Sequence, residues 1–146
     1  MTLKKLTSEA ELYAFISLFV KACEVFKHVT VHRLAHDYFA TLLQNTNYEI
    51  WLLYDEDTLV GFMDLADSRS PVMPFRRTRC QFMYVEPTRS AARLMLQLRR
   101  FAYAHDADSI EVMCKIGFET QWQQHGFQIT SLTLKGPHTW EKLLLT

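Results

Sequence analysis

Residues 79–104 read RCQFMYVEPTRSAARLMLQLRRFAYA, and the apolar pattern of this stretch decides the fold. Arg79 to Val85 is rich in strand formers, and Pro87 ends the run because proline cannot donate to a strand ladder. Apolar residues then recur at helical spacing, at Ala91, Leu94, Met95, Leu98, Phe101 and Ala102. The stretch therefore predicts a strand that runs through a tight turn into an amphipathic helix.

Upstream of this unit, the sequence predicts one short strand and two helices. The strand covers about Leu3 to Leu6, and Ser8 and Glu11 then fit a capping box at the start of a helix. The apolar stripe of that helix is Leu12, Phe15, Ile16, Phe19, Cys23 and Phe26. Thr30 is predicted to cap the second helix, whose stripe is Val31, Leu34, Ala35, Tyr38 and Leu42.

The remaining elements are mostly strands. Residues 48–54 and 58–65 form a predicted hairpin around the polar turn 55–57, and residues 67–74 form a loop. After the central helix come a strand at 109–114, a short helix up to His125 that Gly126 ends, a strand at 127–134 and a tail at 136–146. The order is β-α-α-β-β-β-α-β-α-β. A strand–helix–strand connection in its second half implies a parallel pair. We therefore expect an α/β fold, with a mixed, mostly antiparallel sheet and helices on both faces.

The composition indicates an ordinary soluble protein. The 146 residues fit a single domain, and 49% of them are hydrophobic, which is enough to fill a core. Acidic and basic residues balance at 16 each, so net charge gives no attraction to nucleic acid or to membranes. The three cysteines show no CxxC spacing, which disfavours a zinc site or a disulfide framework. The start lacks a signal-peptide pattern, and no apolar run is long enough to span a membrane, so we expect a cytoplasmic protein.

The start of the central helix has the chemistry of an anion site. The first N–H groups of a helix lack internal partners, and the helix dipole places partial positive charge there. Small residues at 90–92 would let a phosphate come close to the backbone. Arg89 and Arg93 are one helical turn apart and could add charge-assisted contacts. A plain capped helix with exposed arginines fits the same residues.

The whole pattern resembles the GNAT superfamily of acyl-CoA-dependent N-acetyltransferases. The resemblance rests on the element order, on Val60-Gly61-Phe62 in the hairpin, on Gln81 to Val85 followed by Pro87-Thr88-Arg89, and on the late Gly126-Phe127. It implies that acetyl-CoA is the substrate that donates the acetyl group. It also implies that Met83 and Val85 face the pantetheine arm. The pyrophosphate would be surrounded by Arg89, Ser90, Ala91, Ala92 and Arg93.

The sequence departs from the usual family pattern at three places. Ala92 and Leu94 stand where the turn usually has small residues, mostly glycine. Trp122 stands four residues before the late Gly-Phe, where family members often have a tyrosine that protonates the leaving thiolate. An indole cannot serve as a general acid near neutral pH. The catalytic residues are therefore unknown, with Tyr84, Glu86 and His125 as candidates.

Two further sets of residues have alternative interpretations. His28, His32 and His36 are spaced by four, but a new helix starting near Thr30 would separate the first from the others. We therefore predict no metal site there, although these histidines could border the acceptor substrate. A concentration of arginines in the middle of the chain could bind nucleic acid, or could form a solvated face. It comprises Arg69, Arg76, Arg77, Arg79, Arg89, Arg93, Arg99 and Arg100.

These observations leave two main function classes open. The first is an N-acetyltransferase that moves an acetyl group from acetyl-CoA to an amine of a small molecule or a protein. The second is an inactive GNAT-like domain that binds a protein partner, and the chain also resembles short phage-encoded proteins, which implies a virion component or a host-factor binder. The apolar residues Trp140 and Leu143 to Leu145 could cover a sheet edge, pair with a second copy of the chain or dock that partner.

Overall fold

The helices and strands of the computed structural model follow one another in the predicted order, with one strand divided in two. They are β1 (Thr2–Lys5), α1 (Glu9–Val25), α2 (His32–Leu42), β2 (Tyr48–Asp55), β3 (Thr58–Arg69), β4 (Arg76–Cys80), β5 (Met83–Val85), α3 (Ala92–Ala104), β6 (Ser109–Val112) and α4 (Glu119–Gln123). The structure describes residues 1–25, 30–113 and 119–128. The chain divides into two compact units, residues 1–113 and residues 114–146. The assignment of residues 1–146 to a single domain stays a prediction.

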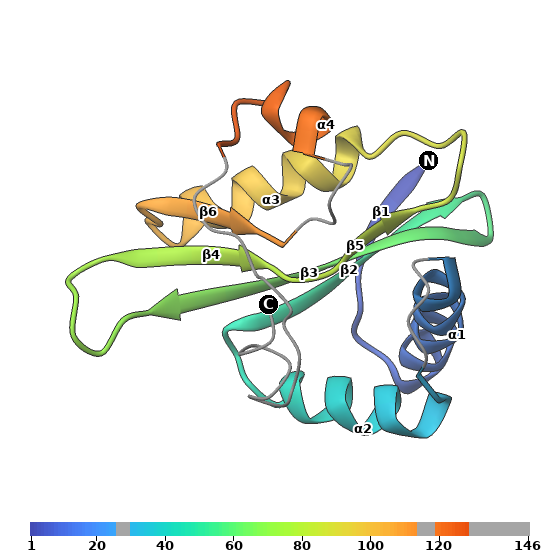
Figure 1. The fold of residues 1–146 in the computed structure, drawn as a ribbon. Helices are drawn as coiled ribbons and strands as arrows, with labels where there is room; N and C mark the ends of the chain where they lie inside the picture. Colours follow the sequence, from blue (N-terminus) through green and yellow to red (C-terminus); the bar gives the residue numbers. More distant parts are fainter. Residues whose placement is uncertain (26–29, 114–118, 129–146) are drawn as a thin grey trace, which may run out of the picture. The chain divides into compact units, whose positions relative to one another are not determined.

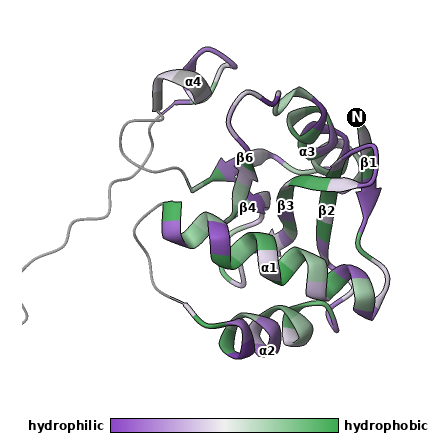
Figure 2. Cartoon of the chain, turned by 90° about the vertical axis from the view of Figure 1, so that its right-hand side faces the viewer, coloured by the Kyte–Doolittle hydropathy of each residue, from purple (hydrophilic) through white to green (hydrophobic). Residues whose placement is uncertain are grey.

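The first unit is built on one mixed sheet. The strand order is β1-β2-β3-β4-β6, and β5 pairs with β3 beside this path. Every pairing is antiparallel except that of β4 with β6, which helix α3 connects as a crossover. Helices α1 and α2 lie on one face of the sheet and α3 on the other (Figures 1 and 2). The predicted fold class, a mostly antiparallel α/β sheet with helices on both faces, is confirmed.

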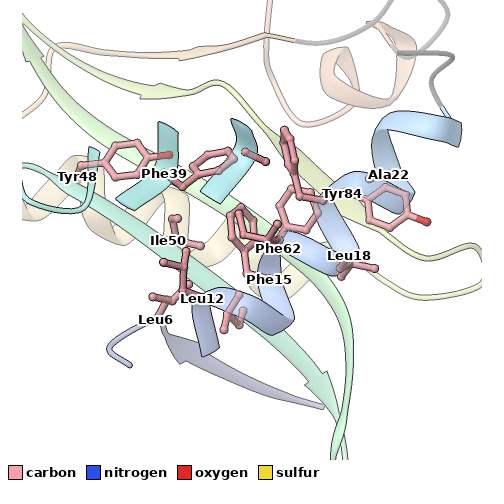
Figure 3. Packing of buried hydrophobic residues seen from close by; sticks show 14 residues of the cluster. Leu6, Leu12, Phe15, Leu18, Ala22, Phe39, Tyr48, Ile50, Phe62 and Tyr84 are labelled. Carbon is pink, nitrogen blue, oxygen red and sulfur yellow. The ribbon is translucent and has the colours of Figure 1, made fainter. Parts of the chain in front are cut away.

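An aromatic cluster fills the space between the sheet and the first two helices. Phe15 of α1 lies at its centre, with ring centroids 4.8 Å from Phe39 of α2 and 5.0 Å from Phe62 of β3, both edge to face (Figure 3). Phe19 contacts the same two rings, and it also lies 5.1 Å from Phe82. Edge-to-face pairs add to the stabilisation that comes from buried area. This cluster therefore holds α1 and α2 on the sheet.

Helix α2 differs from the prediction in its cap and in its buried face. Its N-cap is Val31, without a side-chain hydrogen bond, so the predicted cap at Thr30 is wrong. The buried residues are Ala35 and Phe39, whereas Leu34 is 64% exposed and Tyr38 is 46% exposed. The predicted stripe is therefore right at Ala35 and Leu42, which face the core, and wrong at Val31, Leu34 and Tyr38, which are exposed. Packing of the Phe39 ring into the aromatic cluster selects the face that is buried.

The hairpin of β3 and β4 is longer than predicted. Asp67, Ser68 and Arg69 continue β3 and pair with Thr78, Arg77 and Arg76 of β4. The predicted loop at 67–74 therefore starts three residues too early. Polar residues are tolerated here because the ladder satisfies the backbone, and this end of the hairpin is only partly buried. The predicted last strand at 127–134, Phe26 and the tail at 136–146 lie wholly or mostly outside the described residues.

The predicted capping box at the start of α1 is confirmed. The N–H of Ser8 donates to Glu11 Oε1 at 3.0 Å, and the N–H of Glu11 donates to Ser8 Oγ at 3.2 Å. The N–H of Thr7 also donates to Glu11 Oε1, and the Lys4 ammonium lies 2.8 Å from Glu11 Oε2. The Lys4 ammonium, together with these hydrogen bonds, lowers the pKa of Glu11 to about 2.

Glu11→Gln is expected to lower the free energy of unfolding by about 1 kcal/mol at pH 7, because an amide accepts these hydrogen bonds less strongly than a carboxylate. The stabilisation by ionised Glu11 is complete above its ordinary pKa of 4.5 and is lost as the pH falls toward about 2. The difference between wild type and variant, measured by urea unfolding, should therefore shrink below pH 4.5 and vanish only below about pH 2. Glu24→Gln, an exposed change in the same helix, serves as the control. A difference that persists at low pH would contradict this account.

The described part of the second unit is the short helix α4 and the turn that ends it. Gly126 has φ +88°, and the N–H of Phe127 donates to the carbonyl of Trp122 at 3.2 Å. This is the hydrogen bond of a Schellman motif, for which glycine is favoured. The predicted end of the helix at Gly126 is confirmed. Among the described residues of the whole chain, no helix is long and apolar enough to cross a membrane.

Candidate functional site

The central strand is broken where the sequence predicted one continuous strand from Arg79 to Val85. Strand β4 runs beside β6 up to Cys80, and the N–H of Met113 donates to the carbonyl of Cys80 at 3.0 Å. Strand β5 begins again at Met83 and, within the described ranges, pairs only with β3. The second edge of Met83 to Val85 is therefore left without a strand partner there. The prediction of one uninterrupted strand is wrong.

The break is formed around a buried carboxylate. Asp64 of β3 is 3% exposed, and its Oδ1 accepts the N–H groups of both Gln81 and Phe82, each at 2.8 Å. Consecutive N–H groups point to opposite sides of a regular strand, so two that point to one side mark a bulge. Burial raises the pKa of Asp64, while the hydrogen bonds from Phe82, Tyr48 and Gln81 oppose this shift.

After β5 the chain turns sharply into helix α3. The N–H of Glu86 donates to the carbonyl of Val60 at 2.9 Å, and the N–H of Arg89 donates to the carbonyl of Glu86 at 3.1 Å. Thr88 has φ +72°, a left-handed conformation that non-glycine residues adopt only rarely. Ser90 Oγ then accepts the N–H of Ala92 at 3.2 Å. The turn therefore leads directly into the first residues of the helix.

The N-terminus of α3 is suited to hold an anion. The first helical hydrogen bond joins the N–H of Met95 to the carbonyl of Ala91, so the N–H groups of Arg93 and Leu94 precede it. The first turn contains no acidic residue that would occupy this end. Leu94 is fully buried, so its side chain packs into the core and does not crowd the turn. The departure at Leu94 therefore leaves the turn open.

The two arginines of the turn have different partners. Arg89 forms an ion pair with Asp55, at the end of β2. Arg93 is exposed and makes no ion pair with any residue that the structure describes. The structure thus brings Arg89, Ser90, Ala91, Ala92 and Arg93 together in one turn, adjoining the half-buried Met83 and Val85 of β5.

Close approach of β3 and β5 depends on Gly61. A Cβ at this position would lie 2.9 Å from the carbonyl oxygen of Tyr84, which belongs to the backbone and cannot swing away. We expect Gly61→Ala to cost about 2 kcal/mol of unfolding free energy because β5 must move away from β3. Thermal unfolding of the variant checks this, and a melting temperature equal to that of the wild type would contradict the close approach.

Solved structures resemble this chain over nearly its whole length, although their sequences differ widely. A chain described as a "probable acetyltransferase" matches with a TM-score of 0.76 and 18% identity, covering 95% of this chain and 100% of its own. A "predicted acetyltransferase with acetyl-CoA" from Clostridium acetobutylicum matches with a TM-score of 0.73 and 16% identity, covering 93% and 96%. The chain has the GNAT fold. No protein-family model and no curated protein sequence matches it.

A further structure with the same fold has a different description. A transcriptional regulator from Bacillus halodurans C-125 matches with a TM-score of 0.76 and 12% identity, covering 93% of this chain and 98% of its own. At such identities the likeness establishes the GNAT fold and no more. The activity therefore has to be argued from the residues of the site.

The three candidate catalytic residues lie in different environments on this GNAT scaffold. Tyr84 is 6% exposed, and its ring lies 5.8 Å from that of Phe62 in the core. Glu86, directly after β5, forms an ion pair with Lys21 of α1 at 3.1 Å, and this contact raises the pKa of Lys21. His125 belongs to the second unit, beside Gly126. Only Glu86 combines partial exposure with a place directly after the open edge.

Trp122 has a packing role in the described part of the second unit. Its ring lies 5.0 Å from that of Phe127, with an interplanar angle of 78°. This edge-to-face contact accounts for a large aromatic residue at the position where GNAT enzymes often have tyrosine. The contact supplies no acid for a leaving thiolate.

The histidines border a separate groove between α1 and α2. His36 stacks on Tyr13 at 5.2 Å, and its Nε2 lies 3.0 Å from Glu9 Oε1. That contact raises the pKa of His36. His32 and Arg33 also line the groove, which has a volume of about 290 Å³. His28 lies outside the described residues, and within those ranges no three His, Cys, Asp or Glu side chains are placed to hold a metal.

At least half of the arginines in the arginine-rich set have partners in the structure. Arg77 and Arg79 both contact the Glu111 carboxylate, at 2.7 and 3.5 Å, and Arg77 also stacks on Phe75. Arg76 donates to the carbonyl of His105, and Arg89 is paired with Asp55. These contacts give four of the eight arginines a partner within the chain, which disfavours a continuous strip for nucleic acid.

Sequence reasoning missed the residues that shape the break. Asp64, Tyr48 and Gly61 were not among the candidates, although an aspartate inside the apolar run Phe62-Met63-Asp64-Leu65 was a visible signal. A charged residue at a core position is rarely left without partners. It could therefore have been predicted to accept hydrogen bonds from a neighbouring backbone.

Proposed function

We propose that this chain is an N-acetyltransferase that transfers an acetyl group from acetyl-CoA to the amine of a small molecule or a protein. The observation that carries the proposal is the edge of β5 at Met83 and Val85, which no strand of the described residues pairs with, directly followed by the open N-terminus of α3. An extended chain with amide groups can pair with a free strand edge. A pyrophosphate fits a helix N-terminus flanked by arginines.

Together these two features fit the two halves of acetyl-CoA. The backbone groups of Met83 and Val85 bind the pantetheine arm, and the turn from Arg89 to Arg93 binds the pyrophosphate. The amine then attacks the thioester carbonyl, the C–S bond breaks, and the thiolate leaves with a proton. This direct transfer requires no nucleophile from the protein. Preorganised backbone contacts contribute mainly by holding the thioester in place for the attacking amine.

The proposed pyrophosphate contacts are tested by removing both arginines of the turn. Arg89→Ala combined with Arg93→Ala is expected to weaken acetyl-CoA binding by about a hundredfold, since charge-assisted hydrogen bonds are worth about 1.5–3 kcal/mol each. Isothermal titration calorimetry measures this loss. Pantetheine, which has no pyrophosphate, should bind the double variant and the wild type equally well.

The matched control removes the same charge from the same helix. Arg99→Ala combined with Arg100→Ala should change acetyl-CoA affinity much less, because these residues lie farther along α3. If the wild type shows no heat with millimolar acetyl-CoA, the proposed function is wrong. An equal loss of affinity in both double variants would indicate general charge attraction instead of a built site.

A second candidate is a GNAT-like domain without catalysis that acts by binding a protein partner. It is favoured by Trp122, which supplies no general acid, and by the structural likeness to a transcriptional regulator. Release of free CoA thiol in the presence of a panel of amines distinguishes the two candidates. Binding of acetyl-CoA without any thiol release would favour the second.

A further inference from the structure

We infer that Asp64 is a positioning residue that holds the edge of Met83 to Val85 open for the extended arm of the acyl donor. The inference rests on the proposed function and adds a residue that lies outside the proposed contact surface. Asp64 lies on the neighbouring strand β3, and it is almost completely buried. Its effect on a ligand must therefore pass through the backbone of the break.

The hydrogen bonds of Asp64 are divided between its two oxygens. Oδ1 accepts the N–H groups of Gln81 and Phe82, and Oδ2 accepts the hydroxyl of Tyr48 at 2.8 Å. The N–H of Asp64 itself donates to the carbonyl of Phe82 at 3.0 Å. Main chain and side chain of one residue thus fix both peptide groups of the break.

These contacts decide which way the central strand continues. With both N–H groups turned toward β3, Gln81 and Phe82 form a bulge, and the strand beyond it changes direction. Before the bulge, Cys80 still pairs with Val112 of β6. After it, Met83 to Val85 continue the ladder with β3, which is the pairing that β5 makes within the described part of the chain. Asp64 is therefore placed at the point where the central strand leaves β6.

Burying a carboxylate has a large desolvation free energy, so a buried aspartate indicates a specific role. Ionised groups are rarely buried without a cation, because desolvation is unfavourable. None of the hydrogen bonds described for Asp64 comes from Lys, Arg or His. Two backbone donors and one phenol donor compensate the charge instead. A neutral side chain could fill the same space, but it would hold the two N–H groups less strongly.

Asp64→Asn tests the role directly, and Asp67→Asn is the matched control on the same strand. Asp67 lies three residues along β3, pairs with Thr78 and does not contact the break. Asp64→Asn should weaken acetyl-CoA and pantetheine binding by about tenfold, which corresponds to replacing charge-assisted hydrogen bonds by neutral ones. Calorimetric affinity for ADP, which carries only the pyrophosphate half, should stay unchanged in both variants.

Amide hydrogen exchange supplies a second measurement that needs no ligand. Exchange of the Gln81 and Phe82 amides should be about tenfold faster in Asp64→Asn than in the wild type or in Asp67→Asn, since the acceptor is weaker. Tyr48→Phe removes only the donor to Oδ2. It should also weaken acetyl-CoA and pantetheine binding and speed up exchange of the Gln81 and Phe82 amides, but by smaller factors than Asp64→Asn. This variant keeps the test decisive if Asp64→Asn does not fold.

The outcomes separate the inference from the proposed function. If wild type binds acetyl-CoA and Asp64→Asn binds it equally well, the positioning role is wrong while the function stands. If Asp64→Asn loses affinity for ADP and for pantetheine by equal factors, the substitution destabilises the protein in general. This result would also overturn the positioning role. If the wild type itself binds neither acetyl-CoA nor pantetheine, the proposed function is wrong, and the inference is overturned with it.

Discussion

Leu94→Ala is expected to lower the free energy of unfolding by about 2–5 kcal/mol, which is the usual cost of emptying a fully buried leucine site. Leu94 is 0% exposed and belongs to the first turn of α3, immediately after the proposed pyrophosphate contacts. The change removes apolar burial and leaves a cavity beneath that turn. Chemical denaturation measures the loss.

Leu96→Ala is the natural control for this prediction. Leu96 lies in the same helix, two residues away, but it is 49% exposed, so its truncation should cost about 0.5 kcal/mol or less. Equal effects at the two positions would show that Leu94 does not face the core. They would also reopen the question whether its side chain obstructs the turn, where related proteins usually have a small residue.

Phe15→Ala should cost about 3–5 kcal/mol, because Phe15 is 1% exposed and lies at the centre of the aromatic cluster. Its truncation removes edge-to-face contacts with both Phe39 and Phe62, so it weakens the packing of α2 on the sheet as well as that of α1. A weaker near-ultraviolet circular dichroism signal would show the loss of aromatic packing, and a lower denaturation midpoint would show the loss of stability.

Tyr13→Ala provides the comparison for Phe15. Tyr13 lies on the same helix, is 59% exposed and stacks on His36 at the groove. We expect Tyr13→Ala to lower the free energy of unfolding by well under half as much as Phe15→Ala does. A larger loss at Tyr13 would mean that the groove, and not the aromatic cluster, holds α1 and α2 together.

Periodicity and capping chemistry predicted most of the fold. The stripe of α3 and the reciprocal hydrogen bonds of Ser8 and Glu11 follow from local spacing alone. Helix α2 was harder, because both Leu34 and Phe39 fit an apolar face, and contacts with the rings of Phe15 and Phe19 select Phe39. Local helix propensity and spacing do not determine which of the two faces packs against the core.

The sequence indicated which residues share the turn before α3, but not the shape of the strand that precedes it. Small residues after Pro87 already indicated an anion-binding turn, and the structure places them together with Arg93. The break of the strand depends on Asp64, which is 17 residues away from Gln81 along the chain. Strand formers continue through Gln81 and Phe82, so propensity predicts no interruption. Only the pairing of two distant segments reveals it.

The parallel pairing of β4 with β6 has a consequence for the folding kinetics. Strands β2 and β3 are joined by a short turn, so they can form as a hairpin on a microsecond timescale. Strand β4 acquires β6 only after the whole of α3 has been placed, because the two strands are 29 residues apart between Cys80 and Ser109. Such non-local pairing is slow. Until it is complete, the outer edge of β4 is exposed to other chains, and a newly made protein is most prone to aggregate in that interval.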